Sequence, residues 1–373
     1  MCAMSTPKRL WTINGDFTGL NPTGVARYGG EVVQALDALA AEGHPLTRDL
    51  DMTLVAPREP RELALRAMAV KIVPEFLRPR LPQFWVQAQL PWHVRGGLVS
   101  LCNLAPVAIR RHIACIHDLH TFTMPESYDR GFRLAHKMIL PMLGRRARFI
   151  TTVSEHSRDQ MIQYRVAPAE KIVVAYNGAD HAGRWDASKS KFEYGNRPFA
   201  LCLGQRQKYK NVELILKIAA PLDAIGLDIY IAGDIGEEAL PLPPGGMPRN
   251  VRLLGRVSDE DLARVLDGAV CFLFPSRIEG FGLPAVEAMT RSCPVVASSA
   301  PCMPEICAEG ALYAGPDDPV GWVDAVRHLC GDEHFRRKQG EKGRLRAMRY
   351  TWRGVAEVYL ELMSRIDMES PAR

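Results

Sequence analysis

The sequence lacks the features that mark several large classes of protein. No charge-free apolar stretch approaches the roughly 18–20 residues that a bilayer-spanning helix needs. The first residues contain no apolar core of the secretory kind, so no signal peptide is expected. The formal net charge is only +5 over 373 residues, which does not suggest a nucleic-acid binder. We therefore expect a cytoplasmic protein that contacts a membrane, if at all, only peripherally.

The cysteine pattern excludes two further classes. The nine cysteines are an odd number, and no Cys-x-x-Cys pair occurs among them. Most lie inside apolar runs such as Leu201-Cys202-Leu203. Buried, reduced thiols are the natural interpretation, and we predict neither a disulfide framework nor a zinc site.

Short apolar runs alternate with amphipathic segments along the chain. Strands that alternate with helices are typical of parallel sheets, and 373 residues are enough for two domains. The first helix carries apolar residues at positions 28, 32, 36 and 39. We predict two doubly wound α/β domains, with strands at residues 10–13, 53–56, 71–73, 97–101, 113–116, 148–153, 172–175, 199–203, 228–232, 251–253, 271–274 and 294–297.

A polar segment from Asn177 to Arg197 separates the two series of strands and contains three glycines, as a linker would. We place one Rossmann-like domain at residues 1–177 and the other at residues 178–351. The last helix, at about 352–373, has an apolar stripe and is expected to pack back on the first domain. Two such domains facing each other across a cleft would bring the carboxyl ends of both sheets to a shared site.

The most informative segment holds two glutamates on either side of a glycine loop. Glu279 precedes Gly280-Phe-Gly282-Leu-Pro284, and Glu287 follows. Pro284 fits the first position of a helix, so the amides of Gly282 and Leu283 would face an anion at its positive end. Alternatively, Glu287 complements the helix dipole and Glu279 is a solvated loop acid. The glycines between the two glutamates favour a binding site.

A basic loop follows the predicted strand at residues 199–203. Arg206, Lys208 and Lys210 alternate there, and Asn211 is a candidate N-cap for the next helix. An extended loop would present all three cations on one side. Three cations before a helix N-terminus repel each other and oppose the helix dipole, so a bound diphosphate would relieve the conflict. A solvated basic loop is the alternative.

In the first domain, His117 and Asp118 follow a predicted strand, at the end where α/β sheets bind ligands. Asp118 could orient His117 or cap a turn. Gly24 lies between the first strand and its helix, either to let a phosphate approach or as a simple turn glycine. A full Gly-x-Gly-x-x-Gly is missing from this loop, which argues against dinucleotide binding.

The segment from Glu126 to Arg148 combines six basic residues with apolar ones. The apolar ones are Phe132, Leu134, Met138, Ile139 and Leu143. The segment is either an interfacial helix at an anionic membrane or a solvated helix above a core stripe.

Together these segments resemble glycosyltransferase family 4, a family of retaining enzymes with the GT-B fold. The resemblance covers nearly the whole chain. Glu279 and Glu287 have the spacing of the family's Glu-x7-Glu motif. Further similar segments are Thr23–Tyr28, Cys102–Pro106, Ile116–Leu119, Thr152–Ser157, Tyr176–Gly178, Gly255–Glu260 and Ser299–Glu305.

The resemblance implies a role for each candidate residue. Glu287 would hold the ribose hydroxyls, and Glu279 would act near the reaction centre, together with His117. The donor diphosphate would contact Gly24, Lys210, Gly282, Leu283 and Arg206, although Lys208 competes with Arg206 for the second cationic position. The sugar would contact Glu279, Gly280, Phe281 and His117, and the base would lie beside Gly255, Arg256 and Val257.

These assignments predict a metal-independent, retaining hexosyltransferase without a cofactor. Fixed cations would replace a metal on the diphosphate, so an Asp-x-Asp element is neither needed nor expected. The donor is expected to be GDP-mannose, with UDP-sugars second. The acceptor is expected to be a glycan or polyprenyl-linked glycan in lipopolysaccharide or exopolysaccharide synthesis. The alternatives are a sugar-nucleotide epimerase of the same architecture and a non-catalytic nucleotide-sugar-binding protein.

Overall fold

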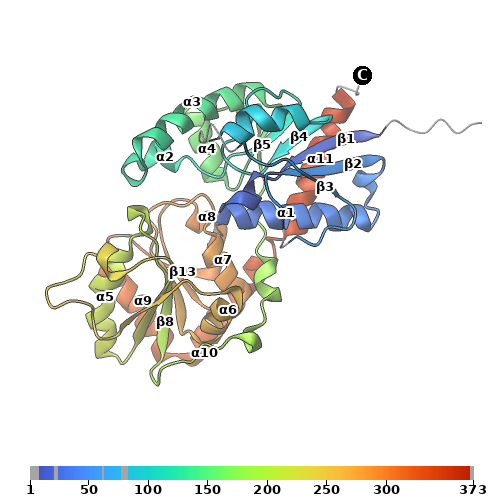
Figure 1. Ribbon diagram of the computed structural model, residues 1–373. Coiled ribbons are helices and arrows are strands. Elements are labelled where there is room, and N and C mark those ends of the chain that lie inside the picture. The colour runs from blue at the N-terminus through green and yellow to red at the C-terminus, as the bar shows by residue number, and fades with distance from the viewer. Residues whose placement is uncertain (1–7, 21–23, 61–62, 77–82, 370–373) are drawn as a thin grey trace, which may run out of the picture. The chain divides into compact units, whose positions relative to one another are not determined.

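The computed structural model describes residues 8–20, 24–60, 63–76 and 83–369. The chain divides into two compact units, seen in Figure 1. Unit 1 comprises Met1–Gly178 and Trp352–Arg373, and unit 2 comprises Ala179–Thr351. In the described part of the chain, no helix is both long enough and apolar enough to cross a membrane.

Unit 1 is built on a seven-stranded parallel sheet in the order β3-β2-β1-β4-β5-β6-β7. The central strands are apolar and buried because helices cover both faces of such a sheet. The strands are β1 (Arg9–Asn14), β2 (Leu50–Ala56), β3 (Ala69–Ile72), β4 (Gly97–Ser100), β5 (His112–Cys115), β6 (Phe149–Thr152) and β7 (Ile172–Val174). The helices are α1 (Gly24–Ala41), α2 (His120–Thr123), α3 (Arg130–Arg146), α4 (Glu155–Gln163) and α11 (Trp352–Glu369).

The C-terminal helix α11 packs beside α1, as the red and blue helices of Figure 1 show. All six apolar positions of its predicted stripe are buried: Trp352, Val355, Tyr359, Leu362, Met363 and Ile366. Near the end of the helix, Asp367 pairs with Arg9 of β1 and with Arg111, which directly precedes β5. These contacts attach α11 to unit 1, although more than 170 residues of sequence separate it from the rest of that unit.

Unit 2 repeats the architecture with a six-stranded parallel sheet in the order β10-β9-β8-β11-β12-β13. Its strands are β8 (Phe199–Leu203), β9 (Asp228–Ala232), β10 (Val251–Gly255), β11 (Cys271–Phe274), β12 (Val295–Ser298) and β13 (Ala311–Ala314). Its helices are α5 (Val212–Ala224), α6 (Asp259–Gly268), α7 (Leu283–Thr290), α8 (Met303–Cys307), α9 (Pro319–Gly331) and α10 (Glu333–Ala347). The two parallel sheets confirm the predicted α/β fold class.

Two expectations about the chain's organisation were wrong. Strand β13 was missed, because its sequence Ala-Leu-Tyr-Ala has neither β-branched residues nor alternation. The segment expected to be a linker is instead packed within unit 2. Ser190 donates to Asp261 Oδ1 at 2.6 Å, and the Tyr194 hydroxyl donates to the Arg264 carbonyl.

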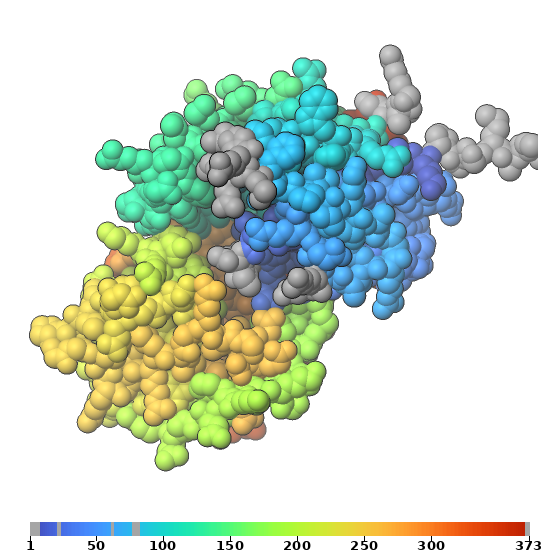
Figure 2. Space-filling view, in the orientation of Figure 1, coloured from blue at the N-terminus to red at the C-terminus, as the bar shows by residue number. Residues whose placement is uncertain are grey.

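Helix α3 lies in the green region of Figure 2. Much of its apolar surface is exposed. Phe132, Leu134 and Met138 are exposed, whereas Leu143 is buried and Ile139 is half-buried. Three of the five apolar residues of this segment therefore do not belong to a core stripe. The side of α3 that packs inward consists of His136, Leu140, Leu143 and Gly144.

Candidate active site

The two glutamates of the glycine loop are both buried in unit 2. Glu279 is 8% exposed, which excludes a solvated loop acid, and Glu287 is 5% exposed. Between them, Gly282 has φ +84°, and a Cβ there would lie 2.7 Å from Met303 Sδ. The positive φ favours glycine, and any larger residue would also have to displace the Met303 side chain. Helix α7 begins at Leu283, so Pro284 occupies its second position rather than the expected first.

Lys210 and Glu279 form a buried ion pair. Lys210 Nζ lies 2.7 Å from Glu279 Oε1, and the two side chains are only 13% and 10% exposed. They come from loops after β8 and β11, which are neighbours in the sheet. Because parallel strands end at the same edge, residues 69 positions apart meet there. The structure therefore brings together the cation predicted for the diphosphate and the carboxylate predicted for the sugar.

The basic loop is not extended, contrary to expectation. A 3-10 turn at Lys208–Lys210 directs Lys210 inward and leaves Lys208 exposed. Arg206 is also exposed and pairs with Glu238, at 2.9 Å. The three cations therefore do not share one side of the loop.

Asn211 joins the two loops instead of capping the next helix. It stands at the N-cap position of α5 with φ 54°, but its side chain accepts no capping hydrogen bond. Its amide donates to the carbonyls of Pro275 and Pro316, at 3.1 and 2.8 Å. The backbone N–H of Arg277 donates to the Tyr209 carbonyl at 2.7 Å. These bonds fix the loop of Lys210 against the loop of Glu279.

Glu287 has a buried partner that sequence reasoning missed. His181 Nε2 lies 2.9 Å from Glu287 Oε1, and the His181 side chain is 1% exposed. His181 belongs to the short helical turn Asp180–Arg184, which packs on α7. Its only signal in the sequence was its place three residues after Gly178, at the end of a segment that resembles the family.

The residues predicted to border the base lie at the end of β10. Gly255 has φ +67°, and its carbonyl accepts a hydrogen bond from the Gly233 N–H at 2.7 Å. Arg256 is exposed and pairs with Asp234 at 2.7 Å, and Val257 is half-buried. The loops after β9 and β10 are thus joined at the carboxyl edge of the sheet.

In unit 1, His117 is held in place from several sides. Its ring Nε2 lies 2.9 Å from the Leu101 carbonyl, and its backbone N–H donates to Asn103 Oδ1 at 2.7 Å. Tyr28 meets the ring edge-on, with centroids 4.6 Å apart. Burial opposes protonation of the ring, but the negative charge of the Cys115 thiolate and a hydrogen bond to the Leu101 carbonyl outweigh it and raise the pKa of His117 to about 9. Contact of His117 with the donor sugar stays a prediction.

Asp118 was expected either to orient His117 or to cap a turn. Asp118 Oδ1 accepts the backbone N–H of His120 at 2.9 Å, which is the turn-capping arrangement.

Gly24 is the exposed first residue of α1, and a Cβ there would meet nothing within 4 Å. Within unit 1, packing therefore does not require a glycine at this position. Thr23, the preceding residue of the motif, lies outside the described residues.

The sequence does contain Asp-x-Asp triplets, at residues 49–51 and 259–261. The first overlaps the start of β2, and the second lies in the first turn of α6, where Asp261 bonds to Ser190. Among the residues that the structure describes, no group of three or more His, Cys, Asp or Glu side chains is placed to hold a metal. The eight described cysteines are free thiols, and burial raises the pKa of Cys202 to about 12.

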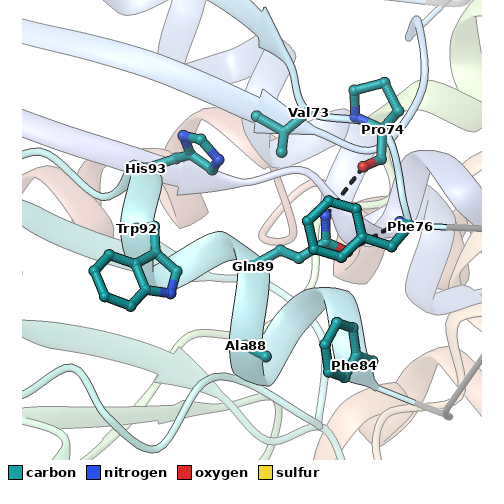
Figure 3. A pocket seen from close by; sticks show the side chains of 8 residues that line it. All are labelled: Val73, Pro74, Phe76, Phe84, Ala88, Gln89, Trp92 and His93. Carbon is teal, nitrogen blue, oxygen red and sulfur yellow. Dashed lines mark hydrogen bonds between the residues drawn. The ribbon is translucent and has the colours of Figure 1, made fainter. Parts of the chain in front are cut away.

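A separate hollow of about 550 Å³ lies in unit 1, between the segment 73–76, which follows β3, and the segment 84–93 (Figure 3). Gln89 crosses its inner side, donating to the Pro74 carbonyl and accepting the Phe76 N–H, both at 3.2 Å. Trp92, at its edge, is 87% exposed. None of the predicted site residues lines this hollow.

Comparison with known proteins agrees with this architecture. Residues 23–182 match the family described as Glycosyltransferase Family 4, and residues 183–346 match Glycosyl transferases group 1. The O-antigen chain mannosyltransferase B of Escherichia coli is 30% identical over 261 residues, 66% of this chain and 68% of that protein. The O-antigen chain mannosyltransferase RfbU of Salmonella typhimurium is 27% identical over 59% of this chain, which spans 61% of that protein.

Solved structures share the fold at low sequence identity. Sucrose-phosphate synthase from Thermosynechococcus elongatus superposes with a TM-score of 0.73 at 17% identity, covering 97% of this chain and all of that chain. HepE of Anabaena, solved in complex with UDP and glucose, has a TM-score of 0.67 at 15% identity, covering 96% and 100%.

Two sheets of parallel strands that match these structures show the GT-B fold. The matches to both halves of the chain, and the relative at 30% identity, then show the family: the chain belongs to glycosyltransferase family 4.

Proposed function

We propose that this glycosyltransferase moves a mannosyl unit from a nucleotide diphosphate sugar to a growing cell-surface glycan, with retention of configuration and without a metal ion. The observation that carries the proposal is the buried pair of Lys210 and Glu279 beside the glycine loop. The two O-antigen mannosyltransferases among its relatives support mannose as the sugar and GDP-mannose as the first donor to test. The UDP complexes of HepE keep UDP-sugars as the second choice.

The ion pair suits a diphosphate leaving group. An ammonium group has three N–H donors, so Lys210 can bind a phosphate oxygen while it keeps its bond to Glu279. The positive end of α7, with the amides of Phe281 to Leu283, would add to this charge. Because positive groups lie where negative charge develops, they stabilise the transition state more than the bound donor. The same fixed charges support transfer without a metal.

Glu279 would then act on the other product of bond breaking. As the diphosphate departs, the sugar ring becomes cationic, and a neighbouring carboxylate lowers the energy of that state. Burial strengthens this effect, because the carboxylate is only about one-tenth exposed. Glu287, one turn into α7, would bind the ribose hydroxyls. Either Arg206, released from Glu238, or Lys208 would supply the second cation on the diphosphate.

The acceptor is expected to be a polyprenyl-linked or other glycan at the cytoplasmic membrane. Helix α3 exposes Phe132, Leu134 and Met138 beside exposed basic residues, namely Arg130, Lys137, Arg145 and Arg146. This combination of apolar and basic groups is suited to an anionic leaflet. The buried free thiols are consistent with a cytoplasmic location.

Separate substitution of the two glutamates tests the proposal. Glu279→Gln should lower kcat and kcat/KM together, by about 10²–10³-fold, with nucleotide affinity little changed. Glu287→Gln should mainly raise the donor KM, by about tenfold, because its bonds are equal in the ground and transition states. Steady-state rates and nucleoside diphosphate affinities distinguish the two. Turnover unchanged in both folded variants, or epimerisation of the donor without acceptor, would contradict the proposal.

A further inference from the structure

His181 and Glu287 form a buried polar contact, and the proposed reaction assigns a role only to Glu287. Their side chains are 1% and 7% exposed, and His181 Nε2 lies 2.9 Å from Glu287 Oε1. They are 106 residues apart in sequence. Such a contact persists only if the segment carrying His181 is fixed relative to α7.

Several bonds fix that segment. Arg291, the residue after α7, donates through Nη1 to the carbonyls of Ala182 and Trp185, at 2.9 and 3.2 Å. The same guanidinium is held in turn by Asp267, at 2.6 Å. The ring of Trp185 meets the His181 imidazole edge-on, with centroids 5.4 Å apart. The imidazole is therefore braced by its own turn and by the far end of α7.

A carboxylate that binds a ribose diol must present its oxygens in one orientation. Glutamate has three side-chain torsions, and a buried hydrogen bond to one oxygen restricts them before the ligand arrives. Such restriction lowers the entropic loss on binding, so it strengthens contacts to the diol rather than contacts elsewhere on the nucleotide.

We propose that His181 is a positioning residue: it orients the Glu287 carboxylate for the two hydroxyls of the donor ribose and so makes the enzyme prefer ribonucleotides. The inference rests on the proposed ribose role of Glu287. A purely structural role for His181 predicts something different. It would stabilise unit 2 as a whole, and its loss would weaken every ligand by the same factor.

The affinity of nucleoside diphosphates with and without ribose hydroxyls separates these possibilities. GDP and 2′,3′-dideoxy-GDP, or the UDP pair if UDP binds better, are titrated calorimetrically into the full-length protein. The unmodified enzyme should prefer the ribonucleotide by about tenfold or more, because two hydrogen bonds to a charged group are at stake. In His181→Leu this preference should fall to about twofold, with the affinity of the dideoxy nucleotide unchanged. His181→Gln, which keeps an N–H donor, should retain most of the preference.

Two further variants complete the design. Gln339→Leu removes another buried hydrogen bond of unit 2, to the Glu309 carbonyl, and should leave the preference unchanged. If His181→Leu does not fold, His181→Asn answers the same question, because its amide is too short to reach Glu287. Equal loss for both nucleotides, or an unchanged preference, in the His181 variant overturns the inference.

Glu287→Gln in the same titration tells which proposal has failed. If it abolishes the ribose preference while His181→Leu keeps it, only the role of His181 is wrong. If Glu287→Gln also leaves the preference unchanged, the ribose assignment within the proposed function is wrong, and the role of His181 falls with it.

Discussion

Replacement of Lys210 by methionine tests the central ion pair most directly. Lys210→Met keeps the apolar stem of the side chain and removes only its charge. The Glu279 carboxylate would then lie about nine-tenths buried without its cation, since it is 10% exposed. Removing one partner of a fully buried pair costs about 3–5 kcal/mol of stability, so the residual exposure suggests about 3 kcal/mol here.

Removing the negative charge of the pair instead should cost less stability. In Glu279→Gln, the amide oxygen still accepts a hydrogen bond from Lys210, and the long lysine stem can move its charge toward solvent. We expect a loss of about 1–2 kcal/mol. In the double variant neither charge is left alone, so the combined loss should be smaller than the sum by about 2 kcal/mol, a coupling in the range for contacting residues.

Urea unfolding of the nucleotide-free protein at pH 7 measures all three variants. Arg206→Met is the matched control, because its partner Glu238 and Arg206 itself are about two-thirds exposed. It should change the free energy of unfolding by less than about 1 kcal/mol. The reasoning would be refuted if the losses for Lys210→Met and Glu279→Gln summed to within about 0.5 kcal/mol of the loss for the double variant. Additive effects would mean that the two groups do not interact in solution.

Three further predictions concern the donor and the membrane. Transfer should continue in EDTA, because fixed cations act on the diphosphate; activity that returns only with added Mg²⁺ or Mn²⁺ would contradict this. Arg206→Ala and Lys208→Ala should differ: the variant that removes the diphosphate ligand should weaken nucleoside diphosphate binding by about tenfold, and the other should change the affinity little. Equal, small effects in both variants would leave Lys210 as the sole cation of this loop in the site. The double variant Leu134→Glu, Met138→Glu should no longer co-sediment with phosphatidylglycerol vesicles. The control Leu345→Glu, at an exposed leucine of α10, should still co-sediment. Retained co-sedimentation of the double variant would exclude this face of α3 as the membrane contact.

The fold was predictable because a buried parallel sheet leaves a local record in the sequence. Strands β8, β9 and β11 were predicted with their observed bounds, since each is a short apolar run that must be buried on both faces. The stripe of α11 was equally clear, since it follows the helical period. By contrast, β13 has no such pattern and was recognised only from its pairing with β12.

The candidate site was only partly predictable. The residue types and their spacing identified Glu279, Glu287 and the basic loop, because a glycine turn before a helix has a recognisable local sequence. The direction of the basic loop was predicted wrongly. Its turn depends on bonds from Asn211 to Pro275 and Pro316, which lie 64 and 105 residues away.

By itself, the sequence determined the α/β class and most strand positions, and it predicted which residues would bind a nucleotide sugar. These depend on local periodicity and residue chemistry, which a single segment contains. Only the tertiary structure decided that Lys210 meets Glu279, that His181 meets Glu287, and that the polar segment after Gly178 packs within unit 2. Such contacts depend on which strands become neighbours and on how side chains turn at the sheet's edge, and neither is written in the spacing of residues along the chain.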